Sequence, residues 1–226
     1  MKFYYHPQSP ACQPVWMVLK ELGIEYEAIE LNLWSGNVDK DELFSVNPYG
    51  KVPALKDGNI CLGESRAVSI YLCSKYEAAD KDKPLYPKDV DSIARINMEL
   101  FADLDSIVAV QKYLNIGAVF SGKAKGPCNE HFPEVKKHID HMEKVLSNQS
   151  YLAGNHLTIL DFCKLNLLGM LDMAGYTEWV EYPKIVEWRD RMSKLSYYEE
   201  CHAAGFKANR QIYTAGNAKY DELEKK

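Results

Sequence analysis

The sequence has no long apolar run, no excess of positive charge and no repeat or low-complexity segment. No stretch approaches the ~20 apolar residues that a membrane-spanning helix needs, and the start MKFYYHPQS lacks the apolar centre of a signal peptide. The net charge of −5 and the pI near 5.7 argue against nucleic acid or an anionic membrane as the main partner. With 46% hydrophobic residues among 226, the chain is long enough to bury one large core or two smaller ones.

The cysteines form no C-x-x-C pair, and most of them lie within apolar patterns. A disulfide framework is typical of small secreted chains with closely ordered cysteines, and this pattern differs from that. We therefore expect reduced thiols in a cytosolic protein. The six cysteines are Cys12, Cys61, Cys73, Cys128, Cys163 and Cys201.

The stretch from Asn47 to Arg66 holds the most informative local pattern. Asp57-Gly58 separates two short apolar runs, which predicts a β-hairpin. The second run leads to Ser65, where a helical pattern opens. A helix that begins there directs its free N–H groups and its positive dipole end at one spot, which suits a carboxylate. Pro53 lies at the start of the first run, where it breaks no strand ladder and where a cis bond remains open.

Elements before this stretch and directly after it predict one compact α/β layer. The sequence predicts a strand at 2–6, a helix at 10–22 that Gly23 stops, and a strand at 26–31. After the hairpin, a further helix is expected at 65–75. A β-α-β unit followed by a β-β-α unit forms a single mixed layer of this kind.

The second half of the chain is predicted to be helical. Residues 77–89 are charged, contain two prolines and show no apolar period, which indicates a linker. The expected division is therefore an α/β domain at 1–76, a linker at 77–89 and an all-helical domain at 90–226. Helices are expected at 90–118, 132–146, 158–173, 183–195 and 197–213, followed by a frayed polar tail at 216–226. The helix at 158 begins with a capping box formed by Thr158 and Asp161.

The whole chain resembles the cytosolic glutathione transferases, and among them the serine-type delta, epsilon and theta classes. These proteins have a thioredoxin-like α/β domain with a mixed sheet, followed by an all-α domain. The matching pieces are spread over most of the chain at consistent spacing. They are Tyr4-Tyr5-x-Pro7-x-Ser9-x-x-Cys12, Asn47-Pro48-x-x-x-Val52-Pro53-x-Leu55, Glu64-Ser65-Arg66-Ala67, Tyr71-Leu72, Leu85-Tyr86-Pro87-Lys88-Asp89 and Leu157-Thr158-x-x-Asp161.

The resemblance implies a glutathione site, with glutathione as co-substrate and no further cofactor. Lys51 is expected to pair with the glycine carboxylate of the tripeptide. Val52, before the cis-proline of the family, would pair its backbone with the cysteinyl unit as an added strand does. Ser65 would take the γ-glutamyl carboxylate. The expected glutathione-binding residues are Lys51, Val52, Pro53, Glu64, Ser65 and Arg66, with Asp103 assisting Glu64 at the ammonium group.

The same resemblance assigns the sulfur of glutathione to Ser9, which precedes the first helix. A free thiol has a pKa near ~8.5, and lowering it by roughly two units takes about 2.7 kcal/mol. A hydroxyl donor together with the helix dipole would supply this, and the thiolate then attacks without a metal or a general base. Two rivals remain open. Cys12 would form a mixed disulfide with glutathione, and Tyr5 would donate to the sulfur as in tyrosine-type members.

The second substrate is expected above the thiolate, against the first long helix and the last helix. Ordinary helix packing explains these candidates equally well. The candidates for the electrophile pocket are Val108, Tyr113, Ile116, Phe120, Phe206 and Tyr213. No metal is expected: Glu134, His138 and His141 share a helical face, but no other residue completes a site, and a solvated polar face is the better interpretation.

Some positions depart from the family pattern. Delta-type enzymes usually carry His at the positions of Val38 and Gly50, so Lys51 would carry more of the contact with the glycine end. Gln13 stands where Arg is common, and Pro14 follows it.

The sequence thus predicts a homodimeric, cytosolic glutathione transferase that conjugates the glutathione thiolate to apolar electrophiles. Tyr76 and Phe101 are candidate contacts between the two copies, although core packing explains them equally. Two alternatives remain, a glutathione-dependent thiol reductase acting through Cys12 and a non-catalytic binding or structural protein of the same fold.

Overall fold

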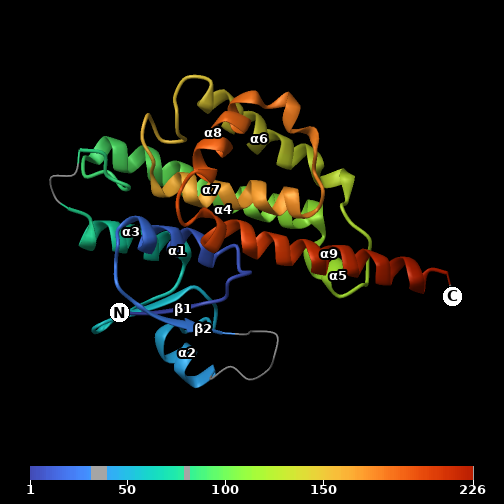
Figure 1. Cartoon of the computed structure of the whole chain (residues 1–226), viewed down its shortest axis with the longest axis horizontal. Coiled ribbons are helices and arrows are strands. Elements are labelled where there is room, and N and C mark those ends of the chain that lie inside the picture. Colours follow the sequence, from blue (N-terminus) through green and yellow to red (C-terminus); the bar gives the residue numbers. More distant parts are fainter. Residues whose placement is uncertain (32–39, 79–81, 226) are drawn as a thin grey trace.

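The computed structural model describes residues 1–31, 40–78 and 82–225. In the first half of the chain, strands and helices alternate as the sequence predicts, with one additional helix (Figure 1). The elements are β1 (Lys2–Tyr5), α1 (Cys12–Glu21), β2 (Glu27–Glu30), α2 (Lys40–Val46), β3 (Ala54–Asp57), β4 (Ile60–Leu62) and α3 (Ser65–Tyr76).

The four strands form one mixed sheet in the order β2-β1-β3-β4. β1 runs parallel to β2, so that Lys2 lies opposite Glu27, as the predicted β-α-β unit requires. β1 and β3 are antiparallel, and so are β3 and β4. The hairpin is closed at Gly58, whose φ of 59° is in the left-handed region that glycine adopts without cost. The predicted hairpin is therefore confirmed.

Helices cover both faces of this sheet. α1 and α3 pack against each other on one face, and α2 lies on the other (Figure 1). α1 begins later than the sequence predicts, at Cys12, and Pro14 fits its first turn because N–H groups there have no helical partner. α2 is not predicted from the sequence. Its side chains Leu43 and Val46 are buried, and α2 packs against β3.

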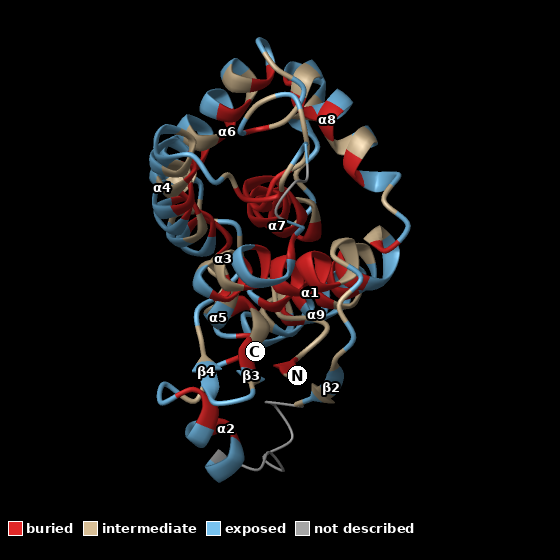
Figure 2. Ribbon diagram, turned by 90° about the vertical axis from the view of Figure 1, so that its left-hand side faces the viewer, coloured by how far each residue is buried: buried red, intermediate tan, exposed pale blue. Residues whose placement is uncertain are grey.

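The second half consists mainly of helices arranged around α7. Figure 2 shows α7 as the most continuously buried helix, and 14 of its 15 residues are buried. Other elements therefore cover every face of α7, including its polar residues Asp161, Lys164 and Asn166. The elements are α4 (Val90–Leu114), α5 (Ile116–Phe120), η1 (Asn129–His131), α6 (Phe132–Leu146), α7 (Ile159–Met173), η2 (Glu178–Glu181), α8 (Pro183–Ser193), η3 (Glu199–Ala203) and α9 (Ala204–Leu223).

Two predictions for this half are wrong. The long helix expected at 90–118 is divided at Asn115, whose φ of 50° ends α4 and lets α5 start in a new direction. The tail expected to fray from residue 216 is helical to Leu223. At Gly216 a Cβ would lie 1.9 Å from a carbonyl oxygen of α5, so glycine permits the close approach of α9 and α5. Lys125 also pairs with Asp221 at 2.8 Å.

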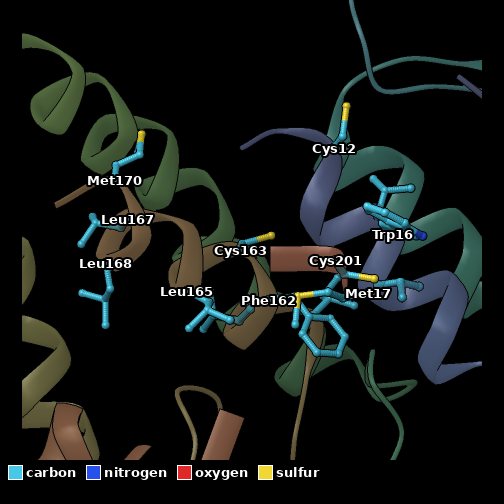
Figure 3. Close-up of a cluster of buried hydrophobic side chains, with 14 of the residues drawn as sticks. Cys12, Trp16, Met17, Phe162, Cys163, Leu165, Leu167, Leu168, Met170 and Cys201 are labelled. Atoms are coloured by element: carbon cyan, nitrogen blue, oxygen red, sulfur yellow. The ribbon is translucent and has the colours of Figure 1, made fainter. Parts of the chain in front are cut away.

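The two halves meet where α1 packs against α7. Figure 3 shows Met17 of α1 close to Phe162 of α7 and to Cys201 of η3, with Cys163 on the same side of α7. All four side chains are at most 1% exposed. We propose the division into domains at 1–76 and 90–226, joined by residues 77–89. No helix in the described ranges is long and apolar enough to cross a membrane.

Candidate active site

Ser9 lies in the turn between β1 and α1. Its backbone N–H donates to the carbonyl oxygen of His6 at 2.9 Å, and the N–H of Cys12 donates to the carbonyl oxygen of Ser9 at 3.0 Å. The N-cap of α1 is Ala11, and no side chain of the described residues caps this helix. Ser9 is therefore not the N-cap, which is the usual structural role of a serine before a helix. It is partly exposed and borders a cavity of about 400 Å³.

Helices of the second half hold this turn through its backbone. The side-chain amide of Asn166 donates to the carbonyl oxygen of Pro10 at 2.7 Å, and that of Asn209 donates to Gln8 at 2.8 Å. Gln13 follows this turn in the first turn of α1. Its side-chain oxygen Oε1 accepts a hydrogen bond from Nδ1 of the buried His202 at 3.0 Å. The turn is thus fixed from the side opposite to the sheet.

The two rivals of Ser9 are placed differently. Cys12 has no exposed surface, and burial raises the pKa of its thiol to about 11 against a smaller, lowering effect of the hydrogen bond with Ser9. A buried neutral thiol is a poor nucleophile. Tyr5 is 9% exposed, stacks on Phe3 and also contacts the ring of Trp16 at a tilt. Neither Cys12 nor Tyr5 borders the cavity beside Ser9.

The predicted anchor stretch is organised by Asn47. The Asn47 amide donates to the carbonyl oxygen of Lys51 at 2.7 Å, and its oxygen accepts the N–H of Tyr49 at 3.1 Å. The Asn47 side chain also lies against Gly63, where a Cβ would come within 2.5 Å of it. One buried side chain therefore joins the start of β3 to the start of α3. Lys51 is exposed and has no ion-pair partner among the described residues.

The Val52–Pro53 bond is cis, as the resemblance implies. Gly50, one of the positions that depart from the delta pattern, has a φ of 58°, and a Cβ there would lie 2.6 Å from the ring of Phe44. A histidine at position 50 would be strained in this backbone and would displace that ring. The other departing position, Val38, lies outside the described residues.

The start of α3 carries the predicted γ-glutamyl anchors. Glu64 is exposed and has φ 62° and ψ 110°, a conformation that costs of order 1–3 kcal/mol for a residue with a side chain and is typical of functional sites. Ser65 is buried, and its hydroxyl accepts a hydrogen bond from Nη1 of Arg66 at 3.0 Å. The first N–H groups of α3 have no helical partners, so they can receive an anion.

Asp103 is placed behind these anchors rather than among them. Its carboxylate is completely buried, and Arg66 donates a hydrogen bond to one of the two oxygens. The other oxygen is 3.4 Å from Nζ of Lys164 and accepts the Ser106 hydroxyl at 2.8 Å. A buried carboxylate with these partners does not reach a ligand directly. It orients Arg66, which in turn contacts Ser65.

The cavity beside Ser9 brings together some of the predicted electrophile contacts and not others. Ile116 and Phe120 border it. Val108 is 47% exposed on α4, and Tyr113 is buried against Phe132. The other cavity residues are not predicted from the sequence; they are His6, Gln8, Pro10, Gln111, Gly117, Ser121, Met170, Met173 and Asn209.

The last two predicted contacts lie within the helical packing. Phe206 is 6% exposed, and its ring packs on His202. Tyr213 donates its hydroxyl to the carbonyl oxygen of Leu114 at 2.9 Å and meets the ring of Phe120 edge-on. Tyr213 therefore packs against Phe120, which borders the cavity, and does not itself border it.

A larger hollow of about 720 Å³ lies between residues 82–99 and 145–158. It borders none of the predicted site residues, and charges of both signs line it, among them Lys88, Asp89, Arg95 and Glu99. The smaller cavity is the better candidate because it joins an apolar wall to Ser9.

Metal-ligating side chains gather away from Ser9. On the solvated polar face predicted for Glu134, His138 and His141, Glu134 pairs with Lys137, and Nε2 of His141 lies 3.1 Å from Glu99. Among the described residues, Cys128, Glu130 and His131 bring their ligand atoms within 4.8 Å of one another. None of these residues borders the cavity at Ser9.

Comparison with known proteins agrees with this geometry. Sequence models of the glutathione S-transferase N-terminal and C-terminal domains match residues 8–75 and 101–195. Among solved structures, the chain is similar to the Drosophila melanogaster glutathione S-transferase isozyme E7, with 30% identity, 96% of each chain covered and a TM-score of 0.86. The housefly epsilon-class enzyme is 26% identical over 96% of this chain and 98% of its own, with a TM-score of 0.85.

A third similar structure contains a ligand. The glutathione transferase homolog from Drosophila mojavensis was solved with bound glutathione; it is 27% identical to this chain and has a TM-score of 0.82. The alignment covers 95% of this chain and 96% of that one. The predicted fold, a thioredoxin-like domain with a mixed sheet followed by an all-α domain, is confirmed by these matches and by the observed sheet.

Proposed function

The chain belongs to the glutathione S-transferase family, and from this premise we propose that Ser9 stabilises the glutathione thiolate for conjugation to apolar electrophiles. The observation that carries the proposal is the position of Ser9. It is partly exposed at an apolar cavity, directly before α1, and it is not used as a helix cap. A hydroxyl donor and the positive end of a helix dipole both favour a thiolate over a thiol.

Glutathione would lie along the residues between Lys51 and Arg66. Lys51, which is exposed and has no ion-pair partner in the part of the chain that the structure describes, suits the glycine carboxylate, and the backbone at Val52–Pro53 suits the cysteinyl unit. The N-terminus of α3, with Ser65 and the exposed Glu64, suits the γ-glutamyl end. The glutathione-bound homolog from Drosophila mojavensis supports this ligand for a fold of this kind. No further cofactor takes part in the proposed reaction.

The electrophile would occupy the cavity beside Ser9. Its apolar wall comes from Ile116 and Phe120 and from two methionines of α7, Met170 and Met173. Methionine is unbranched and adapts to irregular shapes, which suits a pocket that accepts varied apolar substrates.

Substitution of Ser9 by Ala tests the proposal. At pH 7 a thiol of pKa 6.5 is about 76% ionised and one of pKa 8.5 about 3%, so the variant should conjugate 1-chloro-2,4-dinitrobenzene about 25-fold more slowly. The apparent pKa in the pH–rate profile should rise by about two units. Retention on immobilised glutathione by both proteins separates binding from chemistry.

The thiol reductase alternative predicts that activity depends on Cys12 and survives the loss of Ser9. The assignment of Ser9 predicts the reverse. Cys12→Ala should leave conjugation intact, because Cys12 is buried and its pKa is raised. Conjugation that survives Ser9→Ala but is lost in Cys12→Ala would refute the assignment of Ser9. A protein that neither binds immobilised glutathione nor conjugates the chloronitrobenzene would support the non-catalytic alternative instead.

We also propose that the protein is a cytosolic homodimer, with α4 in the interface. Met98, Phe101 and Leu104 are 63, 70 and 43% exposed, and their spacing places them on one face of α4. Exposed apolar stripes of this kind are typical of protein interfaces. Tyr76 is 39% exposed, although its hydroxyl already donates to Asp57 at 2.5 Å.

Sedimentation velocity would test the dimer. Phe101→Glu should convert a dimer into a monomer, because it places a charge in the apolar contact. Val180→Glu is the matched control: Val180 is 87% exposed and lies outside α4. A wild-type protein that sediments as a monomer, or a Phe101→Glu variant that remains dimeric, would contradict the proposed interface.

A further inference from the structure

His6 is a histidine beside Ser9 whose ring nitrogens are both covered and both without a hydrogen-bond partner in the described ranges. It follows β1, and its carbonyl oxygen holds the N–H of Ser9 at 2.9 Å. Imidazole carries a donor and an acceptor, or two donors, so two unpaired nitrogens are unusual inside a protein. Such groups are most often satisfied by a ligand or a water molecule.

The residue borders the cavity in which the electrophile is proposed to bind. Because no hydrogen bond from the described residues fixes the ring, a half-turn about the Cβ–Cγ bond exchanges the positions of each nitrogen and a ring carbon without breaking such a bond. Both nitrogens are covered in the ring orientation of the structure, so a nitrogen would reach a ligand in the cavity only after such a half-turn. Met170, Met173 and Phe120 leave the surrounding wall apolar, which strengthens a hydrogen bond made there.

Two other polar side chains at the cavity already have partners. Asn209 donates to the carbonyl oxygen of Gln8, and the hydroxyl of Ser121 donates to carbonyl oxygens of its own turn at 3.0 Å. The hydroxyl of Ser9 is assigned to the sulfur of glutathione. The side chains of Gln8 and Gln111 also border the cavity and have no hydrogen-bond partner among the described residues, so His6 is one of three polar side chains that are left for the second substrate.

We infer that His6 is a specificity-determining residue, which donates a hydrogen bond to the second substrate and favours electrophiles whose reacting carbon is conjugated to a carbonyl group. The inference rests on the proposed function. In the reaction, the thiolate sulfur forms a bond to the β-carbon and the C=C π electrons move toward the carbonyl oxygen. The N–H of His6 stabilises the resulting enolate oxygen. A proton from water then adds to the α-carbon and replaces the one that the thiol lost.

The test compares two apolar electrophiles in the same full-length enzyme. trans-2-Nonenal has a conjugated carbonyl group, whereas benzyl chloride reacts by displacement and has no carbonyl oxygen. His6→Leu should lower kcat/KM for the alkenal by about 10- to 100-fold relative to benzyl chloride, at or below the lower end of effects typical of oxyanion donors. The loss should fall mainly on kcat, because the bond strengthens in the transition state.

Two further variants serve as controls. His6→Gln, which keeps an N–H donor, should recover part of the alkenal activity. His131→Leu changes a histidine that does not border the cavity and should leave the ratio of the two activities unchanged. His6→Leu changes the polarity of a partly buried position. If the leucine variant folds poorly, the ratio of alkenal activity to benzyl chloride activity is measured in His6→Gln instead.

The outcomes separate the inference from the proposed function. A selective loss of alkenal activity, with partial recovery in His6→Gln, supports the inference. An equal effect on both substrates, no effect, or a wild-type enzyme that accepts benzyl chloride but not the alkenal overturns it while leaving the transferase function in place. A wild-type protein that conjugates neither compound overturns the proposed function itself.

Discussion

Protonation of His202 should make the stability of this fold depend on pH in the range between 7 and 5. His202 is 3% exposed, and its Nδ1 donates to Gln13 next to the Ser9 turn. Burial, with a smaller effect of the Arg189 charge, lowers the pKa of His202 to about 3. The folded protein therefore keeps this imidazole neutral at pH values where the unfolded chain would protonate it.

The magnitude follows from the two pKa values. An unfolded histidine has a pKa near ~6.5, so below that pH the unfolded state binds one more proton than the folded state and the free energy of unfolding decreases. Between pH 7 and pH 5 the loss is about 2 kcal/mol. It hardly depends on the folded pKa, because a value of about 4 in place of about 3 changes the result by less than about 0.1 kcal/mol.

Urea unfolding at both pH values, in the wild type and in His202→Asn, would measure this effect. Asn places a side-chain N–H near the position of Nδ1, so it can still donate to Gln13, and it does not titrate. Subtracting one protein from the other removes the contribution of the remaining titratable groups. The stability of the wild type relative to the variant should fall by about 2 kcal/mol from pH 7 to pH 5.

A clear refutation is available. If the difference between wild type and His202→Asn is the same at pH 7 and pH 5, His202 is not held neutral by burial, and the argument fails.

Three further changes have expected outcomes in unfolding experiments. Asp103→Asn should lower the free energy of unfolding by about 3–5 kcal/mol, because it leaves the buried Lys164 charge uncompensated; a loss below about 1 kcal/mol in urea would contradict the role of this pair. Gly216→Ala should lower the stability by about 1–3 kcal/mol through its clash with α5. Gly117→Ala, in helix α5 with no atom within 4 Å, should instead raise the stability by about 0.4–1 kcal/mol. Hydrogen bonds from a lysine and two tyrosines of α3 hold the pKa of Asp57 well below its usual range. The free energy of unfolding of the wild type should therefore exceed that of Asp57→Asn by its full amount at pH 7, and this difference should shrink below about pH 3.9. An equal difference at pH 7 and pH 2.5 would contradict the expected role of these hydrogen bonds.

Elements with strong local signals could be predicted from the sequence. The Asp57-Gly58 hairpin, the bounds of α6 and the capping box at α7 all follow from residues within a few positions of one another. In the capping box, Oδ2 of Asp161 accepts both the N–H and the hydroxyl of Thr158 at 2.9 Å. Such contacts close short loops, so their entropic cost is small and the local sequence determines them.

Elements that depend on tertiary contacts could not be predicted in the same way. α2 has seven residues, too few for a stable isolated helix, and the burial of Leu43 and Val46 against other elements stabilises it. The break at Asn115 is signalled only by a single Asn, which adopts the left-handed region more readily than most residues. In the sequence the apolar pattern continues through this position, so periodicity alone predicts one uninterrupted helix.

The candidate site shows the same division. Ile116 and Phe120 are predicted from the sequence and border the cavity, whereas Met170 and Met173 do so without being predicted. α7 is buried around its whole circumference, so its periodicity does not identify the face that lines a cavity. Three positions apart, the two methionines share a face, but other apolar residues of α7 lie on every face as well. The sequence does not predict His6 as a cavity residue, because His6 continues a β-type run. A polar residue at the end of such a run is nevertheless a recognisable sign of a site residue.

The environment of Ser9 is a property of the contact between the two halves of the chain. The hydrogen bonds from Asn166 and Asn209 to the Ser9 turn, and from His202 to Gln13 in the α1 helix that follows it, link residues 156, 201 and 189 positions apart. No local pattern encodes pairs at such separations, yet they set where the Ser9 hydroxyl lies relative to the cavity. A thiolate is stabilised only if its donor is held in place before the sulfur arrives, because reorganisation would consume the gain. The helical half therefore does more than provide a wall for the second substrate. It fixes the geometry of the residue proposed to activate the first.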